Sequence, residues 1–138
     1  EWLDRGVQLQ ADSTEEARHA YEEALARDPS LVEAYINLGL LHHKAGRFDA
    51  AELYYQEAIA RDPGVSLAYF NLGVVHEDRG DLPGAIAACR EAVAREPTLK
   101  DAHQHLARLY EAEGRRADAI RHYAAAKALD RPPGKKRR

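Results

Sequence analysis

The sequence is short of several residue types, and each shortage narrows the range of functions. Among 138 residues there are no methionine, one tryptophan and one cysteine. A single cysteine excludes a disulfide framework and a cysteine metal cluster, so Cys89 is expected to be a small buried hydrophobic residue. No run of 18 apolar residues could span a membrane, and no signal peptide is recognisable. We therefore expect a cytoplasmic protein without a membrane segment, and the start at Glu1 without any methionine indicates a piece of a longer protein.

Motifs for catalysis and metal binding are missing as well. The chain has no Gly-x-Ser-x-Gly motif, no phosphate-cradling glycine loop and no His-Glu-x-x-His zinc motif. Seven histidines invite a metal site. However, His42 and His43 are adjacent and His103 and His105 are two residues apart, so neither pair shares one face of a helix. We expect no enzyme activity, no metal and no cofactor.

The sequence does contain a repeat of 34 residues. Shifting the chain against itself by this period aligns a set of small, aromatic, histidine and proline positions. These are Tyr35, Leu38, Gly39, His42, Gly46, Ala51, Tyr55, Ala58 and Pro63, which fall on Tyr69, Leu72, Gly73, His76, Gly80, Ala85, Cys89, Ala92 and Pro97. A second shift gives His103, Leu106, Ala107, Tyr110, Gly114, Ala119, Tyr123 and Ala126, with Pro132 one residue late. A helical repeat of this length indicates a stacked solenoid.

Prolines and glycines divide each repeat into a first helix, A, and a second helix, B. The residue before a proline is displaced from the α region, so a B helix is expected to end before Pro29, Pro63 and Pro97. The turn between A and B is expected at Gly46, Gly80 and Gly114. Gly39 and Gly73 remove a side chain where the A and B helices cross, and His42 and His76 are expected to pack between the paired helices.

The first unit departs from this pattern because its turn glycine is missing. We expect a helix from Glu1 to Gln10, followed by a capping box in which Ser13 and Glu16 bond each other's backbone amides. The second helix of this unit is then predicted from Thr14 to Arg27. In the third unit, Asp81 is expected to cap the B helix.

These positions resemble the tetratricopeptide repeat (TPR) family. The resemblance implies an all-α fold, a right-handed α-solenoid of about four helix-turn-helix units with eight antiparallel helices. It covers residues 1–130 as a single domain, with repeats at about 1–30, 31–64, 65–98 and 99–132, followed by a basic flexible tail at 131–138. TPR domains are mostly protein-interaction modules, so the resemblance implies a non-enzymatic scaffold that binds a peptide or partner segment in the concave groove of the A helices.

Transferring the family's groove positions onto this sequence gives the candidate binding residues. They are Glu33, Ile36, Asn37, Leu40, Lys44, Phe70, Asn71, Val74, Glu77, Asp78, Asp101, His105 and Arg108. Asn37 and Asn71 each precede a Leu-Gly pair, an arrangement that resembles the asparagine ladder in the TPR arm of protein O-linked N-acetylglucosaminyltransferase. An amide carries a donor and an acceptor that match one peptide unit. The alternative is that both asparagines only bond their own solenoid.

Charge suggests the kind of ligand. The tail holds five of the 20 basic residues, so residues 1–130 carry a net charge of about −8. Acidic residues beside apolar groove positions predict a basic, partly apolar protein or peptide ligand, and nucleic acid is disfavoured. The basic tail, Lys135 to Arg138, is most simply a solvated end, and the preference for Arg over Lys with abundant Ala indicates a bacterial source.

Two other functions stay open at this stage. The chain lacks an amphipathic helix after the last repeat, so its uncapped end could mediate self-assembly as a homo-oligomer. Alternatively, the segment is the recruiting arm of a larger enzyme or transcription regulator.

Overall fold

The computed structural model describes residues 14–130, and every regular element in this range is an α-helix. The helices are α2 (Thr14–Arg27), α3 (Val32–Lys44), α4 (Phe48–Arg61), α5 (Ser66–Asp78), α6 (Leu82–Arg95), α7 (Lys100–Ala112) and α8 (Arg116–Ala128). The predicted helix at Glu1–Gln10, the Ser13 capping box and the basic tail lie outside the described residues. The predicted all-α class is confirmed for the part of the chain that is described.

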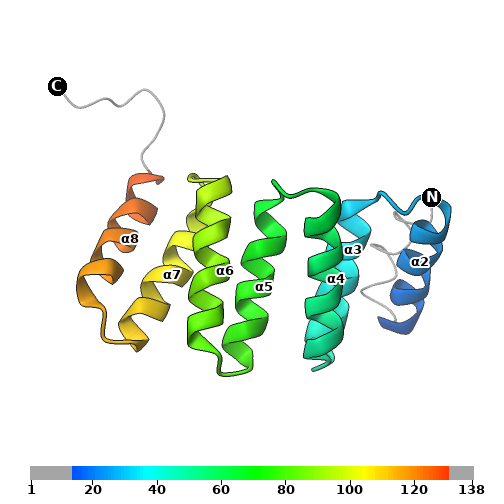
Figure 1. Ribbon diagram of the computed structural model, residues 1–138, viewed down its shortest axis with the longest axis horizontal. Helices are drawn as coiled ribbons and strands as arrows, with labels where there is room; N and C mark the ends of the chain where they lie inside the picture. Colours follow the sequence, from blue (N-terminus) through cyan, green and yellow to red (C-terminus); the bar gives the residue numbers. More distant parts are fainter. Residues whose placement is uncertain (1–13, 131–138) are drawn as a thin grey trace.

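The helices stand side by side in one row, from α2 at one end to α8 at the other (Figure 1). Three complete pairs, α3 with α4, α5 with α6 and α7 with α8, follow α2. This corrects the expected four pairs and eight helices to three pairs and one B helix within residues 14–130. The A helices are thus α3, α5 and α7, and the B helices are α2, α4, α6 and α8.

Glycines allow the A and B helices of two pairs to approach closely. A Cβ atom on Gly39 of α3 would lie 2.4 Å from Cε1 of Tyr55 on α4, and one on Gly73 of α5 would lie 2.7 Å from Sγ of Cys89 on α6. Tyr55 and Cys89 are completely buried. The prediction that these glycines serve the helix crossing is therefore confirmed, as is the buried position of Cys89.

The turns within the pairs also follow the sequence. Gly46, Gly80 and Gly114 have φ angles of 79°, 81° and 76°, in the left-handed region that glycine adopts without strain. The Asp81 side chain accepts a hydrogen bond from the amide of Gly84 at 3.0 Å, which caps α6 as expected. These local signals fix where each pair reverses direction.

Consecutive repeats are joined by an arginine that reaches back one unit. The Arg61 guanidinium lies 4.4 Å from the ring centre of Tyr35, and its Nε donates to the carbonyl of Pro29 at 2.7 Å. Arg95 repeats this contact on Tyr69, at 4.3 Å, and on the carbonyl of Pro63, at 2.7 Å. The prolines therefore end the helices and also present carbonyl acceptors that link the units.

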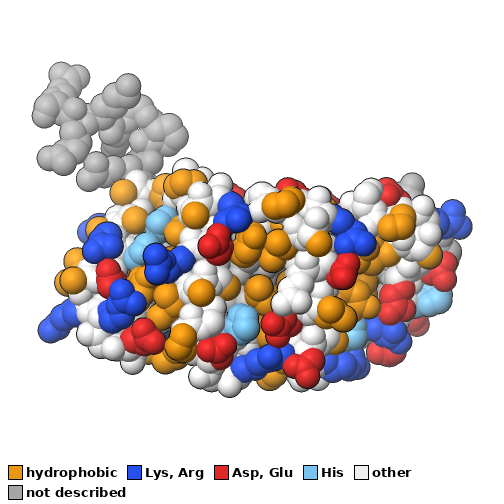
Figure 2. Space-filling model, viewed as in Figure 1, with side chains coloured by type: hydrophobic (Ala, Val, Ile, Leu, Met, Phe, Trp, Pro, Cys, Tyr) orange, Lys and Arg blue, Asp and Glu red, His pale blue; other side chains and the backbone are white. Residues whose placement is uncertain are grey.

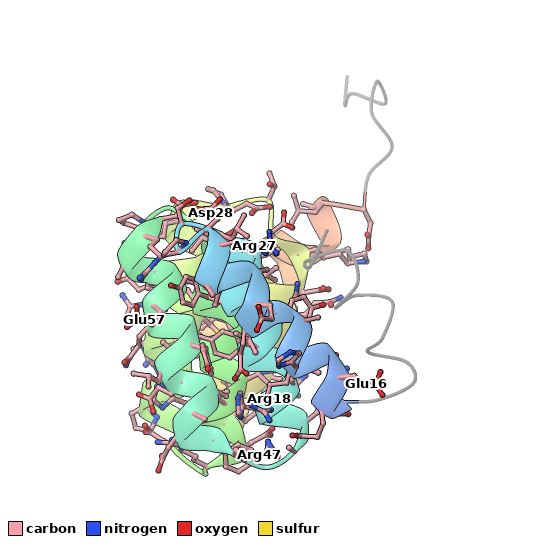
Figure 3. All side chains as sticks on the ribbon, turned by 90° about the vertical axis from the view of Figure 1, so that its right-hand side faces the viewer. Glu16, Arg18, Arg27, Asp28, Arg47 and Glu57 are labelled. Carbon is pink, nitrogen blue, oxygen red and sulfur yellow. The ribbon has the colours of Figure 1, made fainter. Side chains whose placement is uncertain are left out.

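The α2 end is held by charged side chains. Arg18 on α2 bonds Glu15 at 2.6 Å and Glu22 at 2.9 Å, and Arg47 from the turn after α3 lies 3.9 Å from Glu15. Figure 3 shows Arg18 and Arg47 at this end of the molecule, close to the start of α2. Across the described residues, no helix combines the length and the apolar character that crossing a membrane requires.

Candidate functional site

The candidate site, called here the A-helix face, is carried by the three A helices. It consists of the thirteen residues transferred from the family's groove positions, which lie on α3, α5 and α7. Leu40, Phe70 and Val74 are half-buried on it, and Leu67 beside them is exposed. An apolar strip therefore runs across α3 and α5.

Ile36 does not belong to the accessible part of this strip. Its side chain is 6% exposed and packs in the core cluster with Tyr35 and Ala68. The prediction that Ile36 offers an apolar surface to a ligand is wrong, because the side chain fills the contact between neighbouring repeats. The available strip is consequently narrower than the sequence indicated.

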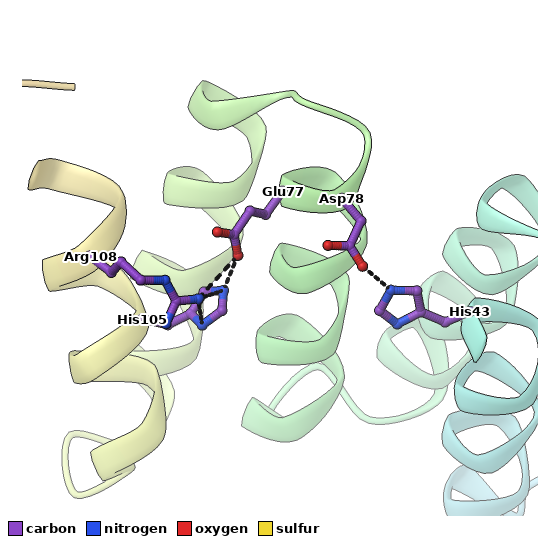
Figure 4. A network of polar contacts seen from close by, with 5 residues as sticks. All are labelled: His43, Glu77, Asp78, His105 and Arg108. Carbon is purple, nitrogen blue, oxygen red and sulfur yellow. Dashed lines mark hydrogen bonds and ion pairs between the residues drawn. The ribbon is translucent and has the colours of Figure 1, made fainter. Parts of the chain in front are cut away.

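Hydrogen bonds and ion pairs join the three A helices across this face (Figure 4). Nε2 of His43 on α3 lies 2.6 Å from Oδ2 of Asp78 on α5. On the other side of α5, Oε1 of Glu77 lies 2.6 Å from Nε2 of His105 and 3.3 Å from Nη2 of Arg108, both on α7. Two adjacent carboxylates on α5 thus bind side chains on the preceding and following repeats.

The contacts of His105 define its protonation. Its Nε2 faces the Glu77 carboxylate, and its Nδ1 lies 3.0 Å from Nη2 of Arg108, which can only donate. A neutral ring with the hydrogen on Nε2 satisfies both neighbours. Burial lowers the pKa of His105, and the nearby Arg108 acts in the same direction against the opposing effect of Glu77. In this contact the neutral imidazole of His105 donates its Nε2–H to the Glu77 carboxylate.

This network reduces the charge that the face offers to a ligand. Glu77 and Asp78 are engaged within the protein, whereas Glu33, Asp101 and Lys44 are exposed and have no side-chain polar partner within residues 14–130. Four carboxylates and two cations among the predicted residues still leave a net charge of −2 with neutral histidines. The acidic character is retained, but it is concentrated at Glu33 and Asp101.

Asn37 and Asn71 occupy equivalent places on α3 and α5. Both side chains are half-buried, and neither forms a side-chain hydrogen bond with any of the described residues. The equivalent residue on α7 is His105, whose ring is occupied by Glu77 and Arg108. The alternative in which the asparagines bond their own solenoid finds no partner for them in this part of the chain.

Sequence reasoning missed the pairing between histidines and carboxylates of different repeats. His43 and Asp78 are 35 residues apart, one more than the repeat. An i to i+35 search for histidine and carboxylate pairs would have found them. It also missed that His103 and His122 meet, with Nδ1 atoms 3.1 Å apart. Within residues 14–130, no group of three or more His, Cys, Asp or Glu side chains is arranged to hold a metal ion.

The arrangement of the helices agrees with comparisons to known proteins. One tetratricopeptide repeat family model matches residues 7–66 and 44–99, and a second matches residues 76–133. The chain belongs to the tetratricopeptide repeat family. TPR domains are generally non-enzymatic modules for protein interaction.

Solved structures give the same fold. A crystal structure of MamA superposes with a TM-score of 0.85 at 25% identity, covering 94% of this chain and 76% of that chain. A second crystal structure of MamA gives a TM-score of 0.81 at 25% identity, covering 94% and 71%. A MamA RS-1 ArsTM double mutant superposes with a TM-score of 0.83 at 21% identity, covering 98% of this chain and 76% of that chain. At this low identity the likeness shows a shared fold only. No curated protein matches the sequence.

Proposed function

We propose that this TPR domain is a scaffold that binds an extended, basic and partly apolar peptide segment along the A-helix face. The observation that supports this most directly is the pair of half-buried amides, Asn37 and Asn71, which have no side-chain partner among residues 14–130. Because these side chains are half-buried rather than fully covered, a ligand can reach their donors and acceptors. Each amide can donate to and accept from one peptide unit, so two of them can hold a backbone without reading its sequence.

The spacing of the repeats suits such a peptide. Packed helices lie about 8–10 Å apart, and an extended chain advances about 3.3 Å per residue. If neighbouring A helices keep that spacing, the two asparagines meet peptide units about three residues apart. The resemblance to the asparagine ladder of the glycosyltransferase arm is then limited to two rungs, because His105 replaces the third.

Side chains around the asparagines set the ligand's character. Phe70, Leu40 and Val74 favour an apolar residue, while the exposed carboxylates of Glu33 on α3 and Asp101 on α7 favour Lys or Arg. Because Glu77 is already bonded to His105 and Arg108, it contributes less to the attraction than its charge alone implies. The peptide that fits best has a basic residue on each side of a central apolar one.

A peptide-library screen tests this proposal. The wild-type domain is compared with Asn37→Ala/Asn71→Ala and with Glu33→Gln/Asp101→Asn. The asparagine variant is expected to lose affinity for all selected peptides alike, because each lost backbone contact costs about 1–3 kcal/mol. The acidic-pair variant is expected to lose selection for Lys and Arg with a smaller dependence of affinity on salt.

Gln56→Ala on α4 serves as the matched control, since it removes an amide from a B helix whose bond to Glu52 is exposed. Its affinity should equal that of the wild type. Enrichment of acidic peptides would refute the charge argument. Unchanged affinity in the asparagine variant would show that the amides have no part in binding.

A second candidate function, self-assembly, is favoured by the α8 end. Ile86 and Cys89 on α6 are 6% and 0% exposed because α7 covers them, whereas the equivalent Ile120 and Tyr123 on α8 are 62% and 42% exposed. The helix α8 carries three basic residues against one acidic residue, and α2 carries four acidic residues against two basic ones. A second copy packed on α8 would cover Ile120 and Tyr123.

Light scattering tests this association. A dimer that dissociates on dilution, and more readily in high salt, is expected for the wild type. Ile120→Lys should abolish it without lowering helix content. A monomer at the highest concentration, or a dimer unaffected by Ile120→Lys, would exclude association through α8.

A further inference from the structure

A pocket lies on the side of the B helices, between α6 and α8, with α7 behind it. Its volume is about 400 Å³, within the range of about 300–1,000 Å³ typical of small-molecule sites. The residues that line it are Arg90, Val93, Ala94, Tyr110, Arg115, Asp118, Arg121 and His122. Tyr110 is two residues beyond Arg108 on α7, so the pocket and the A-helix face lie on different sides of that helix.

The residues that line this pocket carry a net positive charge, although the whole chain has a net charge of −3. Three guanidinium groups, from Arg90, Arg115 and Arg121, face a single carboxylate, Asp118, which leaves a net charge of +2 with His122 neutral. Figure 2 shows Lys and Arg side chains gathered over the end of the molecule that α8 forms. An anion of charge −2 would neutralise the pocket.

The single carboxylate holds two of the arginines in place. Asp118 lies 3.0 Å from Nε and 2.8 Å from Nη2 of Arg115, and 3.2 Å from Nη2 of Arg121. The Arg115 guanidinium also lies 4.6 Å from the ring centre of Tyr110, which fixes its plane. Each guanidinium has five N–H donors, so most donors remain available. Arg90 has no side-chain polar partner among the described residues.

His122, which lines the pocket, stands at the end of a directed chain of hydrogen bonds through His103. His103 Nε2 lies 2.8 Å from the carbonyl of Pro97 and must donate to it, so Nδ1 of a neutral His103 is an acceptor. The neighbouring Nδ1 of His122, 3.1 Å away, must then donate. This leaves Nε2 of neutral His122 without a hydrogen, and protonation would add a donor and a positive charge to the wall.

The earlier junctions between repeats supply an internal comparison. One repeat before Arg90, Arg115, Arg121 and His122, the chain has Gln56, Asp81, Ala87 and Ala88; two repeats before, it has Glu22, Arg47, Leu53 and Tyr54. The stacking of Tyr110 on His122, at 5.6 Å, matches that of His42 on Tyr54, at 5.2 Å, with the residue types exchanged. The stacked pair is thus part of the solenoid, whereas the three arginines occur together only at the last junction.

We propose that the pocket between α6, α7 and α8 binds a phosphate dianion, either free phosphate or the phosphate of a small monoester. A phosphate monoester carries about −1.5 to −2 charges at pH 7 and three acceptor oxygens. Guanidinium groups bind such oxygens through paired N–H donors. The volume leaves room for the remainder of a small molecule beside the phosphate. This site is independent of the peptide-binding function proposed for the A-helix face.

Isothermal titration at constant ionic strength tests the site with inorganic phosphate, glycerol phosphate and acetate. Phosphate is expected to bind with one site per chain, and acetate more weakly. Arg90→Gln and Arg121→Gln should each lower phosphate affinity at least about tenfold, the loss expected for one hydrogen bond to a charged group. Arg116→Gln, which removes the same charge from α8 outside the pocket, should leave it unchanged. Tighter binding of glycerol phosphate would identify the monoester as the source, and tighter binding of inorganic phosphate the free ion.

Equal losses in Arg121→Gln and Arg116→Gln would overturn the proposal, since they would indicate a general surface charge. Acetate binding as tightly as phosphate would also overturn it and would point to a carboxylate ligand. Circular dichroism and melting of each variant confirm that the fold is intact.

A second arm uses sulfate, whose charge does not change with pH. Burial lowers the pKa of His122, assisted by the charges of His103, Arg121 and Arg90 and opposed by Asp118. A bound dianion favours the protonated ring, so sulfate affinity should rise as pH falls below about 6.5. His122→Gln should lose this rise while keeping the affinity measured at pH 8. An identical pH profile in His122→Gln would contradict the placement of the anion against His122.

Discussion

The close approach of α5 and α6 predicts an unusual dependence of one substitution on another. In Gly73→Ala, the new methyl group would lie 2.7 Å from Sγ of Cys89 and 3.2 Å from the carbonyl oxygen of Ala85. The thiol is completely buried. Overpacking of this kind costs about 1–3 kcal/mol, against about 1 kcal/mol gained because alanine favours a helix more than glycine. We expect Gly73→Ala to lower the free energy of unfolding by up to about 2 kcal/mol.

Removing the sulfur should change the sign of this effect. In a Cys89→Ala background the shortest contact disappears, while the gain in helix propensity remains. Gly73→Ala should then be neutral or stabilising by up to about 1 kcal/mol. The coupling free energy between the two positions should reach about 1 kcal/mol or more, as for residues in direct contact.

Urea unfolding followed by circular dichroism measures all four proteins of this cycle. Gly64→Ala is the matched control, since its Cβ would meet only Oδ1 of Asp62 at an ordinary 3.5 Å. That variant should be neutral or slightly stabilised because alanine restricts the unfolded chain. If Gly73→Ala is as stable as Gly64→Ala, or if Cys89→Ala leaves its cost unchanged, the packing argument is wrong.

Three further predictions concern stability. Asp81→Ala should cost about 1 kcal/mol by removing the cap on the Gly84 amide, and Asp81→Asn should restore most of it in urea unfolding. Arg95→Gln should cost about 1 kcal/mol, because it removes the cation–π contact with Tyr69 and the bond to the Pro63 carbonyl; a melting temperature equal to wild type would contradict this. Burial lowers the pKa of His42, so the folded state binds fewer protons than the unfolded state. The free energy of unfolding should therefore be highest above about pH 6.5 and fall as the pH decreases below that value. The fall should be smaller in His42→Tyr, which has no imidazole at this position.

Features that repeat along the chain were predictable from the sequence. Glycines at one period marked all three turns and the crossings of two helix pairs, because glycine adopts a positive φ without strain and leaves room for a neighbouring helix. The stacking of His42 on Tyr54 likewise confirms the expectation of a packing role, since Tyr110 and His122 form the same pair with exchanged residues. A residue that recurs at one period reports on the shared scaffold.

Features that differ between repeats were predicted less well. Ile36 was assigned to the ligand-facing strip by its position in the repeat. Whether such a side chain is covered depends on the distance between neighbouring repeats. A repeating sequence pattern does not give that distance. The pairing of His43 with Asp78 and of Glu77 with His105 was also missed. Each pair joins different positions of adjacent repeats, so the alignment at 34 residues does not bring its members together.

The cross-repeat pairs and the unpaired asparagines have opposite consequences on the same face. His43, Asp78, Glu77 and His105 use their hydrogen-bonding groups within the protein, which holds neighbouring A helices at a fixed separation. Asn37 and Asn71, on the same helices, are left with donors and acceptors unused within residues 14–130. A ligand that bonds both amides therefore meets them at a preset distance and loses little free energy in ordering the protein. On this reasoning Asp78→Ala, which removes the partner of His43 and leaves both amides in place, should weaken peptide binding chiefly for long peptides that span both repeats.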